Sequence, residues 1–176
     1  YWLHNHLLAL DWPEGKIMEL NNKLRYRILE SARLAGEWYC NVQNTPENPW
    51  GGVHDSADKG RYIYEYYPAT KRCYGLGAWG QGLAIMSLLT LARQLDKGNT
   101  GEKYRQSALW ASGYLDSLQI INPSDPKAHG GFREHTPQMS WSYPRDGATG
   151  AMGYCALYKE TGREEYLERA RLYCQW

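Results

Sequence analysis

The stretch DGATGAMGYCALYKETGREEYLERARLYCQW, residues 146–176, decides the fold. Its first half consists of small and apolar residues, as in a helix that packs closely against its neighbours. The short turn ETGRE follows at 160–164, and from Glu164 onward apolar and charged residues alternate at the spacing of an amphipathic helix. The stretch therefore predicts a helical hairpin, with an inner helix over about 147–160 and an outer helix after it.

The same inner-to-outer order occurs earlier in the chain. Residues 82–97 (GLAIMSLLTLARQLDK) are apolar almost all round, which indicates a buried helix. After a short turn at 96–102, residues 102 to about 120 carry apolar positions on one stripe and charges on the opposite side. A further amphipathic helix runs from Lys16 to about Gln43. We therefore expect an all-α chain of stacked helical hairpins.

The connections at the other end of these hairpins are long. They cover about 44–76 and 121–146 and are rich in Trp, Tyr, His, Asp, Glu and Arg. PWGGVHD (49–55) is echoed by AHGGFRE (128–134), and the outer helices repeat a shorter pattern, GEKYRQSA and REEYLERA. Because long loops within a compact domain are usually functional, this rim of the molecule is where we expect a binding face.

The first long connection contains a strand pattern. Residues 61–68 (RYIYEYYP) alternate in a way that puts Tyr62, Tyr64 and Tyr66 on one face of a short strand or β-hairpin. The following GLGAWG (75–80) has GxGxxG spacing but lacks the βαβ surroundings of a dinucleotide site, so we interpret its glycines as a tight turn.

Composition narrows the class of partner. The chain has 176 residues, of which 20 are basic and 19 acidic, without a basic run, so neither DNA nor RNA is expected as a partner. No apolar stretch approaches the ~20 residues of a membrane span, so no membrane partner is expected either. Eight Trp and fifteen Tyr accompany a single Phe. Trp and Tyr rings stack on sugar rings while their N–H and O–H groups reach hydroxyls, which favours carbohydrate binding; packing between helices is the alternative for part of them.

Metal and cofactor motifs are not found in the sequence. The cysteines Cys40, Cys73, Cys155 and Cys174 have no CxxC or Cys/His spacing, so no structural zinc is expected. Cys40 and Cys73 flank one long loop and could pair in an oxidising compartment; free thiols are the alternative. HExxH, GxSxG, SxxK and P-loop motifs do not occur, and we expect neither a metal nor a cofactor.

Residues 146–176 resemble the hairpin repeat of the six-hairpin glycosidase superfamily, the (α/α)6 toroids: an Asp opens a small-residue inner helix, a TG turn follows, and the outer helix carries a Tyr and then an Ala. WGQGLAIMSLLTLA (79–92) is similar to an inner helix of unsaturated glucuronyl and rhamnogalacturonyl hydrolases. The resemblance implies that Trp79 and Gln81 point into the mouth of a toroid. A toroid has twelve helices, so we expect residues 1–176 to form a single domain or a fragment of one, completed by sequence outside this chain.

Glycosidic bond cleavage needs one protonated and one ionised carboxyl group across the bond. HDSAD (54–58) offers Asp55 and Asp58, for which Asx turns and helix capping are the alternative, and the second long loop offers Glu134. His135 and Tyr143 are auxiliary candidates for proton transfer.

The remaining polar and aromatic loop residues are candidates for substrate binding. Arg133 and Arg145 can hold the carboxylate of a uronic acid, and Trp141 offers a stacking surface. Asp146 is either a substrate ligand or the N-cap of the following helix. The predicted substrate-binding residues are Trp50, His54, Trp79, Gln81, Arg133, Trp141, Arg145 and Asp146.

These observations predict a glycoside hydrolase that acts on uronic-acid-containing or related oligosaccharides or polysaccharides. Two alternatives stay open. A polysaccharide lyase or uronyl epimerase on the same toroid would use His54, His135, Tyr143 and Arg145 to remove a proton next to a carboxylate. A non-catalytic helical-repeat module would use the aromatic rim only to bind sugar.

Overall fold

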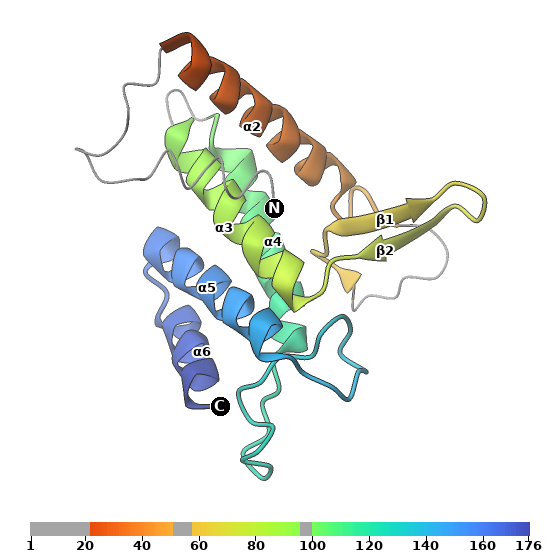
Figure 1. The fold of residues 1–176 in the computed structure, drawn as a ribbon, viewed down its shortest axis with the longest axis vertical. Coiled ribbons are helices and arrows are strands. Elements are labelled where there is room, and N and C mark those ends of the chain that lie inside the picture. The colour runs from red at the N-terminus through yellow and green to blue at the C-terminus, as the bar shows by residue number, and fades with distance from the viewer. Residues whose placement is uncertain (1–21, 51–57, 96–99) are drawn as a thin grey trace.

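The computed structural model describes residues 22–50, 58–95 and 100–176. These residues form five helices and one two-stranded sheet, in the order α2 (Asn22–Val42), β1 (Ile63–Tyr67), β2 (Arg72–Gly75), α3 (Ala78–Gln94), α4 (Glu102–Leu118), α5 (Pro144–Thr161) and α6 (Glu164–Gln175). Figure 1 shows α3–α4 and α5–α6 as helical hairpins, with α2 and the β-hairpin beside the first of them. The prediction of a mainly helical chain with a short β-hairpin is confirmed.

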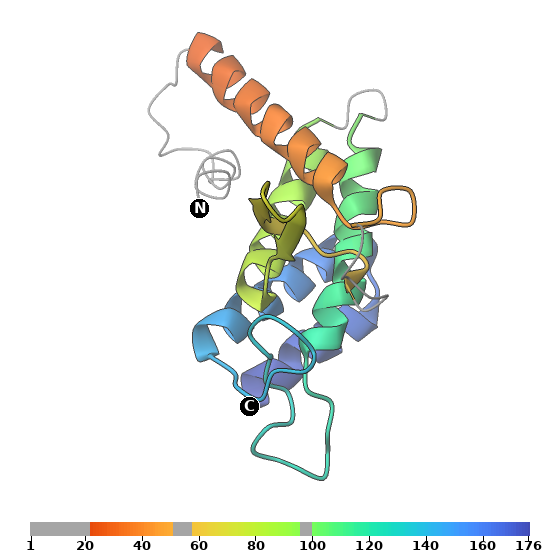
Figure 2. The ribbon, with the colours of Figure 1, turned by 90° about the vertical axis from the view of Figure 1, so that its right-hand side faces the viewer.

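Helices α3 and α5 form the most extensive helix–helix interface of the described chain. Their backbones touch at Gly82 of α3, where an added Cβ would meet the main chain of Thr149 and Gly150. A Cβ added at Gly153 of α5 would in turn lie 3.0 Å from the Cα atom of Gly82. The small residues of the two predicted inner helices therefore allow α3 and α5 to lie side by side, while α4 packs on α3 and α6 packs on α5 (Figure 2).

The hydrophobic core forms where these four helices meet. Phe132, the single Phe of the chain, is fully buried and its ring contacts those of Tyr154 and Tyr173. The largest fully buried side chains are Tyr62, Tyr104, Tyr114, Tyr154, Phe132, Ile85, Leu88, Leu89, Leu91, Leu115 and Leu118. Four of these eleven are tyrosines, so part of the Tyr enrichment serves packing.

The ends of α5 show how its sequence sets its length. Pro144 opens the helix with Tyr143 as the N-cap residue, and Pro suits this position because the first helical N–H has no partner within the helix. Gly162 ends it in the left-handed region (φ 70°), with its N–H donating to the carbonyl of Tyr158 at 2.8 Å. Asp146 lies inside the first turn, so the interpretation of Asp146 as the N-cap is wrong.

The predicted β-hairpin is present, but burial does not follow the alternation of its first strand. Tyr62 is fully buried, but the side chains from Tyr64 onward are exposed on both faces, with Tyr64 at 59% and Tyr66 at 53%. The pairing register shifts between Ile63 and Glu65, and beyond this point the hairpin extends away from the helices (Figure 1), so neither face is covered. Burial therefore ends with the base of the hairpin instead of following a period of two.

All four cysteines are free thiols, so Cys40 and Cys73 are not paired in this structure. Within the described ranges, none of the helices combines the length and the hydrophobicity that crossing a membrane would require.

The contact at Gly82 leads to a testable prediction. Gly82→Ala should lower the free energy of unfolding by about 1–3 kcal/mol, because the new methyl group must push apart two packed backbones. Gly113→Ala is the matched control, since nothing lies within 4 Å of its Cβ position in the interior of α4, and it should raise stability by about 0.5–1 kcal/mol. Urea unfolding of both variants measures the difference, and equal stabilisation by the two substitutions would contradict the close packing of α3 and α5.

Candidate functional site

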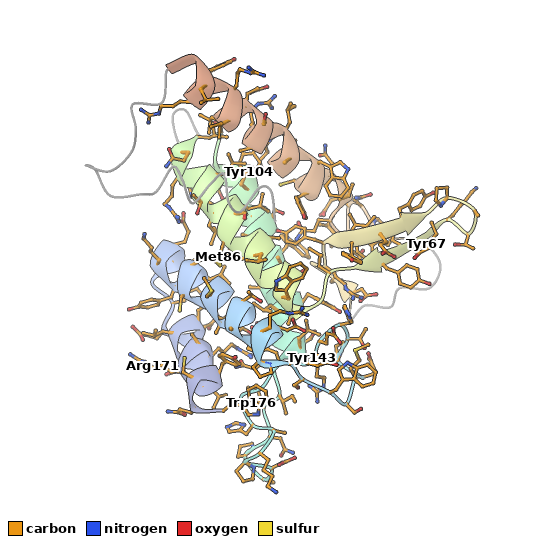
Figure 3. The ribbon with its side chains drawn as sticks, viewed as in Figure 1. Tyr67, Met86, Tyr104, Tyr143, Arg171 and Trp176 are labelled. Carbon is orange, nitrogen blue, oxygen red and sulfur yellow. The ribbon has the colours of Figure 1, made fainter. Side chains whose placement is uncertain are left out.

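Polar and aromatic side chains gather where the first turns of α3 and α5 meet the loop of residues 133–142. The N–H of Ala78 at the start of α3 donates to the carbonyl of Glu134 at 2.8 Å. At Gly77 an added Cβ would lie 2.8 Å from Nδ1 of His135, so the absence of a side chain there lets the loop rest on the helix. Figure 3 labels Tyr143 where this loop enters α5. The candidate site is defined by Trp79, Glu134, His135, Trp141, Arg145 and Asp146.

Arg61 holds the loop of residues 133–142 in position. Its guanidinium donates to the carbonyls of Gly75 (2.9 Å), Leu76 (3.0 Å) and His135 (3.0 Å), and it stacks on the ring of Tyr114 at 4.8 Å from the centroid. The hydroxyl of Tyr114 donates to the same His135 carbonyl at 2.6 Å. The base of the β-hairpin, the approach to α3 and the candidate site are therefore held by one buried cation.

Asp58, a predicted catalytic carboxylate, is the ion-pair partner of Arg61. Its Oδ1 lies 3.0 Å from Nη1 of Arg61, and the two side chains are only 15% and 8% exposed. This arrangement neutralises the buried guanidinium, a structural role that the sequence did not indicate. The other two candidates of the same motif, His54 and Asp55, lie outside the described residues.

Two predicted substrate-binding residues are interior residues instead. Gln81 is fully buried, its amide nitrogen donates to the carbonyls of Gly60 and Ala111, and its oxygen accepts the N–H of Tyr62 at 3.2 Å. Its expected position in the mouth is therefore corrected. Trp50 is likewise buried, and its indole N–H donates to the carbonyl of Val42 at 2.8 Å.

Glu134 and His135 form a polar pair at the surface of the loop. Oε1 of Glu134 lies 3.3 Å from Nε2 of His135, and Oε2 accepts the indole N–H of Trp141 at 2.8 Å. The Glu134 side chain is 20% exposed and that of His135 is 47% exposed. Carboxyl and imidazole groups are the side chains that most often transfer protons to and from a bound molecule, and here the two lie side by side.

Arg145 and Asp146 form the second part of the site. Nε of Arg145 donates to Oδ1 of Asp146 at 2.8 Å, and its guanidinium carbon lies 5.6 Å from the centre of the Trp79 ring, as in a cation–π contact. The Arg145 side chain is 67% exposed, whereas that of Asp146 is 1% exposed. The exposed guanidinium of Arg145 thus lies over both the buried carboxylate of Asp146 and the ring of Trp79.

The two remaining predicted residues flank this group. Arg133 pairs through its backbone with Ser142 and donates its N–H to the carbonyl of Leu118, which closes the base of the loop. Tyr143 is 50% exposed, and its carbonyl accepts the N–H of Asp146 at 3.0 Å. Both therefore lie next to the candidate site, but neither side chain is placed within it by a hydrogen bond.

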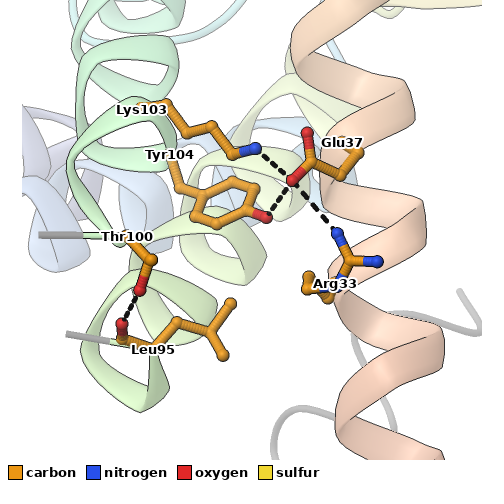
Figure 4. A pocket seen from close by; sticks show the side chains of 6 residues that line it. All are labelled: Arg33, Glu37, Leu95, Thr100, Lys103 and Tyr104. Atoms are coloured by element: carbon orange, nitrogen blue, oxygen red, sulfur yellow. Dashed lines mark hydrogen bonds and ion pairs between the residues drawn. The ribbon is translucent and has the colours of Figure 1, made fainter. Parts of the chain in front are cut away.

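A pocket of about 360 Å³ lies at the opposite end of the hairpins, between α2, the end of α3 and the start of α4 (Figure 4). It is lined by Arg33, Glu37, Leu95, Thr100, Lys103 and Tyr104. The Glu37 carboxylate accepts hydrogen bonds from Lys103, Tyr104 and Arg33, and the Lys103 ammonium is the main reason that the pKa of Glu37 is lowered. The charged groups that line this pocket pair with one another, so we assign the pocket no function.

No protein-family model matches the chain, and no curated protein matches it. Among residues 22–50, 58–95 and 100–176, no three His, Cys, Asp or Glu side chains lie close enough together to hold a metal ion. The geometry of the candidate site is therefore what indicates a function.

The position of Arg61 generates a second prediction. Arg61→Lys should lower the free energy of unfolding by about 3–5 kcal/mol, because a lysine cannot replace the donors to three carbonyls and leaves Asp58 poorly paired in the interior. Protease cleavage within 133–142 should also become faster, since the loop loses its support. Arg145→Lys, at an exposed position, is the control and should change stability by less than about 1 kcal/mol. Equal urea midpoints for the two variants would show that Arg61 does not hold the loop.

Proposed function

We propose that this chain belongs to a carbohydrate-active enzyme, a glycoside hydrolase that acts on uronic-acid-containing oligosaccharides or polysaccharides. The observation that carries the proposal is the Glu134–His135 pair, which lies beside the exposed indole of Trp141. An acid–base pair next to an aromatic face is the combination needed to stack a sugar ring and move a proton at its glycosidic oxygen.

The exposed aromatic surface supports a sugar as the ligand. Trp141 is 52% exposed and Tyr143 is 50% exposed, although both flank charged groups. Such amphipathic rings offer an apolar face to the C–H groups of a sugar. The indole N–H of Trp141 is donated to Glu134, which leaves the ring face for stacking. Arg145 adds specificity, because its exposed guanidinium can turn its donor fork towards the carboxylate of a uronic acid.

In the proposed reaction, Glu134 and His135 exchange protons with the leaving oxygen and the attacking water. A hydrolase also needs a second carboxyl group across the bond. Asp58 is held by Arg61, so the candidates are Asp146 and, outside the described residues, Asp55.

We also propose that α3–α4 and α5–α6 are two hairpins of an (α/α)6 toroid whose remaining hairpins come from sequence outside this chain. Three features support this: the inner helices α3 and α5 lie side by side, α4 and α6 pack outside them, and the candidate site lies at the ends joined by long loops. The aromatic loops would then line the mouth of the toroid.

A second candidate function is a polysaccharide lyase or uronyl epimerase. It is favoured by the imidazole of His135 and the phenol of Tyr143, which lie on the segment that leads into the first turn of α5, where Arg145 is exposed. Such a base could remove the proton next to a uronate carboxyl group that the guanidinium binds. A lyase leaves an unsaturated product that absorbs ultraviolet light, whereas a hydrolase does not.

The test is incubation of the complete protein that contains this chain with a panel of uronate oligosaccharides, followed by both reducing-sugar release and ultraviolet absorbance. Glu134→Gln should reduce turnover by about 10²- to 10⁴-fold if Glu134 transfers a proton. Glu168→Gln changes an exposed carboxylate on α6 in the same way and should leave turnover unchanged.

Each alternative outcome has a clear meaning. Full activity of Glu134→Gln would remove Glu134 from the mechanism, and new ultraviolet absorbance would replace the hydrolase by a lyase. Sugar binding without turnover of any substrate would instead favour the non-catalytic module.

A further inference from the structure

Asp146 contains a buried oxygen atom with an unmet hydrogen-bonding requirement. The residue is fully buried in the first turn of α5, and its Oδ2 is the one buried side-chain atom of the described chain that lacks a hydrogen-bond partner. Buried polar atoms are nearly always hydrogen-bonded, so an orphaned carboxylate oxygen indicates a partner that binds there.

The neighbourhood of Asp146 suggests what that partner is. Arg145 donates to the other oxygen, Oδ1, and at the same time lies over the ring of Trp79. Its guanidinium thus donates an N–H to the Asp146 carboxylate while its flat face lies over the indole of Trp79. A sugar ring has the same combination, with hydroxyl donors at its edge and C–H groups on its face.

We propose that Asp146 is a ligand-binding residue whose Oδ2 accepts a hydrogen bond from a hydroxyl group of a bound sugar, with Trp79 as the stacking surface. The identity of the ligand as a sugar rests on the function proposed above. Arg145 is the side chain that must move, and its exposure leaves it room to do so. With a uronic acid, the ligand carboxylate attracts the guanidinium away from Asp146, so that both oxygens of Asp146 face the ligand.

A purely structural role explains Asp146 less well. A carboxylate in the first turn of a helix interacts favourably with the helix dipole, but this benefit does not require burial. The hydrogen bond that the Asp146 side chain accepts comes from the Arg145 side chain, not from a backbone N–H at the start of α5. Burial without a donor to Oδ2 therefore destabilises the free protein, and this is the signature of a residue retained for binding.

The first arm of the test measures thermal stability without any ligand. Asp146→Asn keeps the shape of the side chain and an acceptor for Arg145, and it removes a buried charge whose ion-pair partner is an exposed guanidinium, so the melting temperature should stay constant or rise. Asp58→Asn is the matched control: it takes the charge from a carboxylate that is paired with buried Arg61, and it should lower the melting temperature by several degrees. A comparable fall in Asp146→Asn would overturn the proposal.

The second arm measures binding of trigalacturonate, maltotriose and butylammonium by calorimetry. We expect trigalacturonate to bind to the wild type more tightly than maltotriose and at least tenfold more weakly to Asp146→Asn. Sugar binding that is unaffected by Asp146→Asn would overturn this inference and leave the proposed function intact. Butylammonium binding that depends on Asp146, without any sugar binding, would keep Asp146 as a ligand acceptor and reject the carbohydrate function. If none of the three probes binds to the wild type, the inference is rejected.

Discussion

The close contact between α3 and α5 at Gly82 is the constraint on which the candidate site depends. Because no side chain separates the two backbones there, the preceding turns of the two helices also lie next to each other. Trp79 lies three residues before Gly82, and Arg145 lies four residues before Thr149, which Gly82 contacts. One helical turn from the contact, the ring and the guanidinium therefore meet, and Asp146 is buried between the same elements.

The sequence predicts most of the helical framework because local patterns determine it. The turn at Gly162 follows from the conformational freedom of glycine, and α6 begins at the predicted residue, Glu164. α5 begins at Pro144, earlier than the predicted start near residue 147, because proline suits the first helical position and Asp146 does not act as the cap. The pattern in 61–68 predicts the β-hairpin but not its burial, because a period of two reports burial only where a strand has one covered face, and here the hairpin leaves the core after Ile63.

The candidate site was predictable as a set of residue types but not as an arrangement. Glu134, His135, Trp141 and Arg145 belong to one loop and its helix, so their proximity follows from the sequence. The role of Arg61 does not, since its acceptors are main-chain carbonyls that any residue type supplies. Gln81 shows the same difficulty, because its partners are three backbone groups from distant segments.

The attachment of the loop to Arg61 affects how such a site can diversify. The main chain of the loop 133–142 is held by Arg61, which also binds the base of the β-hairpin, and by Tyr114 of α4. The loop would therefore lose its geometry if it were transplanted to another scaffold. New ligand preferences would arise more readily by substitution at exposed positions next to the fixed loop, such as Tyr143 or Arg145. The backbone of the loop is thus held by buried groups, whereas the exposed side chains next to it can be substituted, by selection or by an engineer, without disturbing the fold.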